Sequence, residues 1–107
     1  MFEVNNNNRE LASVKIDNQT FDIIASHHAM ERMEEREVDP YVVTGNVLAL
    51  GPERIGQLQI NNDEAIIIDE VNDVSVVVGV GEQSITIITV IAKSNVFVKN
   101  NTKIYNI

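Results

Sequence analysis

Three patterns in the 107-residue chain predict an α+β fold. The stretch before residue 26 alternates apolar and polar residues, as a half-buried β-hairpin does. Residues 27–37 contain no glycine, proline or β-branched residue and place apolar side chains at helical spacing. After Gly51, β-branched runs alternate with turn residues about every ten positions, which is typical of an antiparallel meander. We therefore expect an N-terminal hairpin and two short helices packed on a four- to five-stranded antiparallel sheet.

The first part of the chain divides into a terminus and the hairpin. The asparagine run Asn5 to Asn8 is polar and of low complexity, so residues 1–12 are expected to be a flexible or turn-rich terminus. Residues 13–107 are then a single α+β domain, because the chain is too short for two hydrophobic cores. Asp17 and Asn18 are expected to form the turn of the hairpin.

Two helices are expected between the hairpin and the sheet. Ser26 is a suitable N-cap for the first helix, over residues 27–37. Asp39 is a suitable N-cap for the second, with Pro40 at its first helical position. The pair Gly51-Pro52 is expected to end that second helix.

The rest of the chain is expected to form the sheet. Its central runs are apolar at both alternating positions, which is typical of strands covered on one face by helices. The expected strands have the sequences QLQI, EAIIID, VSVVVGV, SITIITVIAK and NVFVKNNTKIYN.

The charge of the chain is unevenly distributed. Sixteen acidic and eight basic residues give a net charge of −8. All of the acidic residues lie between Glu3 and Glu82, whereas Lys93, Lys99 and Lys103 follow them unopposed. An acidic body repels phosphate backbones at long range, which argues against general binding to nucleic acid. Two classes of protein remain: an inhibitor that presents carboxylates to a basic partner, and an enzyme whose anion site is local.

Composition excludes several other classes. The absence of cysteine excludes disulfides, a thiol nucleophile and cysteine-bound metal. The two histidines are adjacent, which excludes a histidine-rich metal site, so we expect neither a metal nor another cofactor. No apolar run approaches the roughly 18 residues that a membrane span needs, and the first residues do not resemble a signal peptide. We therefore expect a cytoplasmic protein with no membrane partner.

The strongest candidate site lies on the first expected helix. His28, Arg32 and Arg36 recur every four residues and therefore share one stripe of the helix. Two arginines at this spacing repel each other, yet together with a histidine they make a site that binds phosphate and exchanges a proton near neutral pH. The alternative is a merely solvated helix, in which the glutamates of the same segment neutralise the arginines and His28 packs half-buried against the sheet.

The same residues carry a resemblance. The stretch SHHAMERMEEREVDPYVV is similar to the strand, His-Ala-x-x-Arg-Met-x-x-Arg, turn and helix signature of a family of small bacterial and phage proteins. That family is similar to RelE and BrnT toxins, within the barnase, EndoU, colicin and RelE ribonuclease fold. His28-Ala29 and Arg32-Met33 match in register, and Arg36 matches the second arginine. Glu37 stands where the family usually has glycine. In order of elements the resemblance covers roughly residues 22–92.

The resemblance implies two helices on a twisted antiparallel sheet and, in toxin members, RNA cleavage without metal. It implies His28 as general acid or base and Arg32 and Arg36 as a phosphate clamp. It also implies a polar residue on the late strand, Thr86 or Thr89, which would complete the catalytic pocket with Lys93 as a further phosphate ligand. The alternatives are ordinary β-propensity for the threonines and a solubilising role at a sheet edge for Lys93.

Two functions follow as expectations. The first is a RelE-like, metal-independent endoribonuclease or toxin-like protein that uses His28, Arg32, Arg36 and Thr89 on RNA. The second is a non-catalytic acidic phage or accessory protein that binds and inhibits a host or defence protein. A third expectation is a structural homodimer with no ligand, in which the long β-branched C-terminal strands pair with another chain through a sheet edge.

Overall fold

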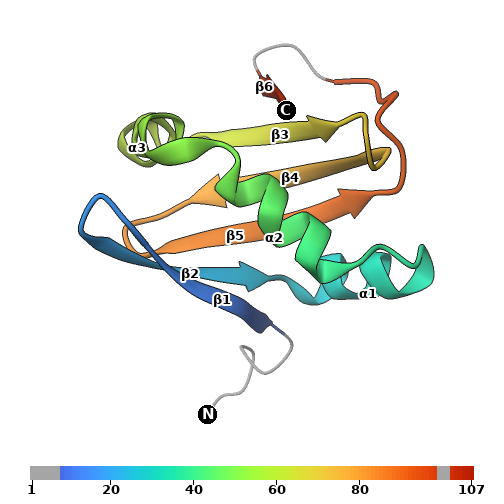
Figure 1. The fold of residues 1–107 in the computed structure, drawn as a ribbon, viewed down its shortest axis with the longest axis horizontal. Coiled ribbons are helices and arrows are strands. Elements are labelled where there is room, and N and C mark those ends of the chain that lie inside the picture. Colours follow the sequence, from blue (N-terminus) through green and yellow to red (C-terminus); the bar gives the residue numbers. More distant parts are fainter. Residues whose placement is uncertain (1–7, 99–101) are drawn as a thin grey trace.

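The computed structural model describes residues 8–98 and 102–107 and has an α+β fold. A sheet of six strands is packed against three helices (Figure 1). The strands are β1 (Arg9–Ile16), β2 (Gln19–Ala25), β3 (Glu64–Asp69), β4 (Val74–Val80), β5 (Ser84–Ile91) and β6 (Lys103–Asn106). The helices are α1 (His27–Glu35), α2 (Pro40–Leu48) and α3 (Gly51–Asn61).

The sheet differs from the expected antiparallel meander. Its strand order is β1-β2-β5-β4-β3-β6, and it is mixed because β2 runs parallel to β5 and β3 runs parallel to β6. The antiparallel pairing of β3 with β4 and of β4 with β5 is as expected, whereas the prediction of only four to five strands, all antiparallel, is wrong. The physical reason is that the N-terminal hairpin adds to the edge of the meander beside β5, so its strands join the main sheet instead of standing apart.

The hairpin and both predicted caps are confirmed. Asp17 and Asn18 both have positive φ, as the tight turn between β1 and β2 requires. The Ser26 side chain accepts a hydrogen bond from the backbone N–H of Ala29, and the Asp39 side chain accepts one from Tyr41. Of the expected terminus, residues 1–7 lie outside the described residues, and residues 9–12 belong to β1.

The prediction of two helices is wrong, because α3 was missed. Gly51 does not end the helical region; with φ of 83° it turns the chain, and Pro52 then occupies the first turn of α3. The segment QLQI, predicted as a strand, lies within this helix, where Leu58 and Ile55 share the buried side at i, i+3 spacing. Of the last predicted strand, the described part is a strand only over Lys103–Asn106.

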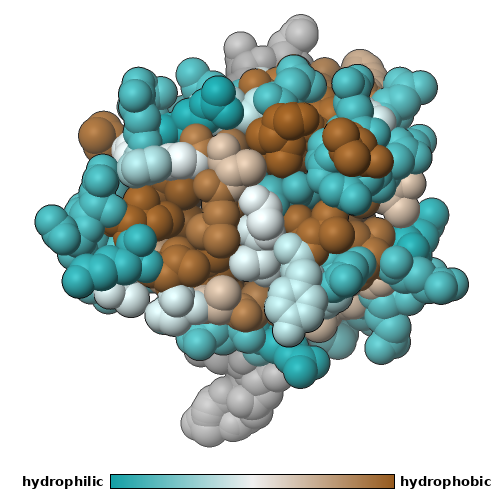
Figure 2. Space-filling model, in the orientation of Figure 1, coloured by the Kyte–Doolittle hydropathy of each residue, from teal (hydrophilic) through white to brown (hydrophobic). Residues whose placement is uncertain are grey.

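The core lies between the helices and one face of the sheet. Buried side chains of β2, β3, β4 and β5 on this face form one cluster with buried side chains of all three helices. Helix α2 crosses this face in front of the central strands and carries no charged residue (Figure 1). Figure 2 shows the same face with apolar to neutral surface over its centre and a hydrophilic rim. None of the helices in the described ranges is long and apolar enough to cross a membrane.

Helix α1 lies where β2 would otherwise continue. The ladder between β2 and β5 ends with Ala25 opposite Ile87, and the next backbone N–H, that of Ser26, still donates to the Ile87 carbonyl. The chain then enters α1, so this helix, instead of a strand, borders the last residues of β5. The end of β5 is therefore open to side chains from α1.

Candidate functional site

Ser26 holds the start of α1 against β5. Its hydroxyl donates to the Ile88 carbonyl at 2.9 Å and accepts from the Ala29 N–H at 3.0 Å. Ala29 and Met33 face the core, which fixes the rotation of the helix about its axis. With that rotation, Arg32 and Arg36 lie on the side of α1 that borders β5.

An irregularity of β5 also shapes the site. The register shifts between Val77 and Val78 of β4, so that Ile88 is an extra residue in β5. Such a bulge locally re-aims the side chains that follow it. Thr89, the next residue, borders the open end of the strand beside α1.

A groove of about 310 Å³ forms between α1 and the end of β5, and we call it the α1–β5 groove. It brings together Arg32, Arg36, Thr89 and Lys93, four of the six candidate residues named from the sequence. Three of these side chains are cationic and the fourth carries a hydroxyl. The full lining is Arg32, Arg36, Thr89, Val90, Ile91, Ala92 and Lys93.

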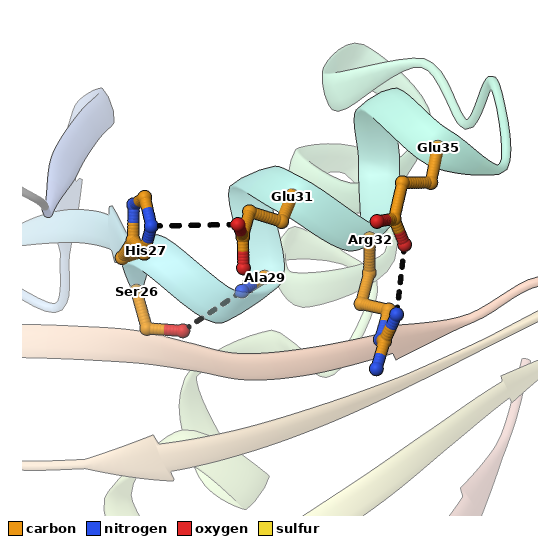
Figure 3. A network of polar contacts seen from close by, with 6 residues as sticks. All are labelled: Ser26, His27, Ala29, Glu31, Arg32 and Glu35. Carbon is orange, nitrogen blue, oxygen red and sulfur yellow. Dashed lines mark hydrogen bonds and ion pairs between the residues drawn. The ribbon is translucent and has the colours of Figure 1, made fainter.

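The cations of the groove differ in their partners. Arg32 Nη1 lies 2.7 Å from Glu35 Oε1, in a pair whose side chains are 41% and 55% exposed (Figure 3). An exposed pair of this kind is worth only about 0.2–1 kcal/mol, so an incoming phosphate can replace the carboxylate. Among residues 8–98 and 102–107, no carboxylate lies within 4 Å of the Arg36 guanidinium or the Lys93 ammonium. These two cations are available to an anion.

His28 and Thr86 lie outside the groove. His28 is exposed on α1, four residues before Arg32, and is not part of the groove lining. Four residues of helix correspond to about 6 Å along the axis, which places His28 beyond one end of the groove. Thr86 is half-buried opposite Ile24 and Gly79, before the bulge of β5. The structure therefore separates the predicted proton-transfer residue from the cation cluster and favours Thr89 over Thr86.

The other side of α1 borders a larger hollow of about 550 Å³, which we call the α1–β1 hollow. His27 and Glu31 line it, with His27 Nε2 3.6 Å from Glu31 Oε2 (Figure 3). Glu34 and the apolar side chains of Met30 and Met33 line it as well. Arg9, at the start of β1, lines the hollow from the opposite side. Helix α1 thus separates a cationic groove from a hollow that holds two carboxylates and one arginine.

The C-terminal end of α1 has a left-handed residue at the position where the RelE-like signature usually has glycine. The Glu37 N–H donates to Glu34 O at 3.3 Å and the Val38 N–H donates to Met33 O at 2.9 Å, which together form a Schellman motif. Glu37 occupies the left-handed position of that motif with φ of 56°. Glycine is the residue that this position favours. Glu37 is also where the chain departs from the signature that it resembles.

The described residues contain no group of three or more histidine, cysteine, aspartate or glutamate side chains placed to hold a metal ion. The polar side chains of the α1–β5 groove are three cations and one hydroxyl, a set that suits an oxyanion better than a metal ion. No family model, curated protein or solved structure shows a significant match to the chain.

Proposed function

We propose that the chain is a RelE-like, metal-independent ribonuclease of bacterial or phage origin, whose scissile phosphate binds in the α1–β5 groove. The observation that carries the proposal is the convergence of Arg32, Arg36 and Lys93, from a helix and a strand end far apart in sequence, on one small groove. Bringing three cations together in an otherwise acidic protein costs repulsion, which an anionic ligand removes. Arginine also binds phosphate in a bidentate way.

The geometry suggests how the residues would share the reaction. In cleavage by internal transfer, the ribose 2′ oxygen bonds to phosphorus, its proton passes to a base, the P–O5′ bond breaks and O5′ takes up a proton. Arg32, Arg36 and Lys93 stabilise the extra negative charge on the phosphorane, and the Thr89 hydroxyl donates to one of its oxygens. His28 is exposed one turn along the helix from Arg32, and as the general base it would take the 2′ proton of a ribose that extends from the groove toward it, while solvent water supplies the proton to O5′.

The left-handed backbone of Glu37 supports membership in the RelE-like family. A family that usually has glycine after the second arginine needs a helix end at which φ is positive, and this chain has such an end. The small size of the groove and the acidic body further indicate a short, single-stranded segment of RNA and not a long duplex, which would need many more phosphate contacts.

Cleavage of RNA by the purified protein in the presence of a chelator tests the proposal. We expect wild-type protein to cut single-stranded RNA, and Arg36→Ala and Lys93→Ala to reduce the rate by at least about tenfold each, as loss of a charge-assisted hydrogen bond does. Lys15→Ala removes an exposed cation of β1 that does not line the groove, and this matched control should keep full activity. Cleavage that is unchanged in both groove variants would contradict the proposal.

We propose binding to a basic host or defence protein as the second candidate function. The α1–β1 hollow favours it, because apolar Met30 and Met33 lie beside the carboxylates of Glu31 and Glu34. Of the two methionines only Met30 is partly exposed, since Met33 is buried in the core, so Met30 offers apolar surface for the stem of a partner's lysine or arginine and the two carboxylates face its charged head. An effect on bacterial growth that survives Arg36→Ala but is lost in the double variant Glu31→Gln/Glu34→Gln would favour this function over cleavage. The reverse pattern would exclude it.

A further inference from the structure

One peptide bond beside the α1–β5 groove is held on both of its polar sides by side chains. It is the bond between Lys93 and Ser94, just beyond the end of β5. The Ser75 hydroxyl donates to the Lys93 carbonyl at 2.8 Å. The Ser94 N–H donates to Asp73 Oδ1 at 2.8 Å, and the Ser94 hydroxyl donates to the same oxygen at 2.9 Å. Ser75 and Asp73 therefore form a clamp on this peptide bond.

The clamp replaces backbone pairing at the place where that pairing ends. The last pair of the ladder between β4 and β5 is Ser75 with Ile91. The segment before Ser75 cannot continue this pairing, because β4 begins at Val74 and the backbone turns away at Asp73, which has a positive φ of 55°. Figure 1 shows the chain leaving β5 beside the turn that joins β3 to β4. The side chains of Ser75 and of Asp73, the residue before β4, therefore hold this segment as far as Ser94, three residues beyond the last backbone pair.

Ser75 is an unusual residue for its position. It is fully buried in the strand VSVVVGV, whose other positions are mostly valine. A buried hydroxyl costs free energy unless it is hydrogen-bonded, and valine fits a pleated, buried strand at least as well. The hydrogen bond to the Lys93 carbonyl is therefore what serine adds at this position.

We propose that Ser75 and Asp73 are positioning residues that fix Lys93 in the α1–β5 groove. The inference rests on the proposed function, because Lys93 matters only if the groove binds phosphate. Lys93 has a long, flexible side chain, so the direction in which its ammonium reaches the groove depends on how firmly its backbone is held. Ser75 and Asp73 are not among the residues that line the groove, although Asp73 shares an adjoining hollow with Arg36.

A double-mutant cycle on RNA affinity tests the inference. The ligand is a fluorescein-labelled, 2′-O-methyl tetranucleotide, which cannot be cleaved, and the measurement is anisotropy at fixed salt concentration. We expect Lys93→Ala to weaken binding by about tenfold or more, and Ser75→Ala and Asp73→Ala by about two- to fivefold each. In the Lys93→Ala background, Ser75→Ala should cause no further weakening, because its effect passes through Lys93.

Two controls separate positioning from general stability. Asp73→Asn keeps an acceptor oxygen for Ser94 and removes a negative charge from the hollow that Asp73 shares with Arg36, so its RNA affinity should be no weaker than that of the wild type. Ser84→Ala removes a hydroxyl from the opposite end of β5 and should leave RNA affinity unchanged. Hydrogen exchange of the Ser94 amide gives a readout that needs no ligand: it should be slow in the wild type and faster in Asp73→Ala.

The outcomes distinguish the inference from the proposed function. Equal weakening by Ser75→Ala in the wild-type and Lys93→Ala backgrounds would overturn the inference, because it indicates a general structural effect. If Arg36→Ala and Lys93→Ala weaken binding but Ser75→Ala and Asp73→Ala do not, the inference alone is wrong. If Arg36→Ala and Lys93→Ala both bind RNA as the wild type does, the proposed function and the inference fail together.

Discussion

Glu35 limits the phosphate affinity of the α1–β5 groove, so its neutralisation should strengthen RNA binding. Its carboxylate accepts a 2.7 Å hydrogen bond from Arg32, which a phosphate must displace. An exposed pair of this kind is worth about 0.2–1 kcal/mol, so Glu35→Gln should tighten binding by about 1.4- to 5-fold. The measurement is the Kd for the uncleavable tetranucleotide at low and at physiological salt concentration, and the gain should shrink as salt screens the charges.

Glu34→Gln is the matched control for this prediction. It changes the net charge of the same helix by the same amount, but Glu34 lines the α1–β1 hollow on the other side of α1. Long-range electrostatics therefore affect the two variants alike, and only the local pair with Arg32 differs. An equal gain in both variants, or weaker binding by Glu35→Gln, would refute the assignment of Arg32 to a phosphate site.

Three further predictions concern stability. Glu37→Gly should raise the free energy of unfolding by roughly 0.5–1 kcal/mol, because glycine adopts the left-handed backbone of this position without strain. The control Glu34→Gly, within α1, should lower the free energy of unfolding by about 1 kcal/mol, and chemical denaturation measures both changes. Asn46→Leu should raise the melting temperature, because the buried Asn46 Nδ2 has no hydrogen-bond partner among the described residues and such a donor costs about 1–3 kcal/mol; a lower melting temperature would contradict this reading of α2. The hydrogen bonds from the Ser94 N–H and hydroxyl hold the pKa of Asp73 below its usual range. Ionised Asp73 therefore stabilises the fold above the unfolded-state pKa, and this stabilisation is lost as the pH falls through the folded-state pKa. Urea midpoints should therefore fall more steeply for the wild type than for Asp73→Asn once the pH drops below about 4, and parallel curves would exclude the linkage.

Local signals in the sequence predicted the elements that depend on local chemistry. The turn at Asp17 and Asn18, the caps Ser26 and Asp39 and the helix after residue 26 follow from backbone preferences and short-range hydrogen bonds, and the structure confirms them. Gly51-Pro52 misled the prediction because the same pair suits both the end of one helix and the start of the next. The parallel pairing of β2 with β5 has no local signal, because it depends on contacts about sixty residues apart.

Only the part of the candidate site that lies on one helix can be predicted from local sequence patterns. The spacing of Arg32 and Arg36 indicates one helix face, and the resemblance brought in Thr89 and Lys93, which the structure places in the same groove. The sequence carried no sign that the end of β5 borders α1, since a bulge and the hydroxyl of Ser26 produce that arrangement. Nor does a single serine in a valine-rich strand reveal that its partner is a carbonyl eighteen residues away.

The central claim is that the α1–β5 groove binds the phosphate of single-stranded RNA. NMR titration of the labelled protein with the uncleavable tetranucleotide tests it most directly, because every backbone amide and arginine side chain reports its own position. We expect the shifts to concentrate on the amides of residues 89–93 and the guanidinium groups of Arg32 and Arg36. Shifts centred on His27 and Met33 in the α1–β1 hollow, or no shifts at saturating ligand, would contradict it.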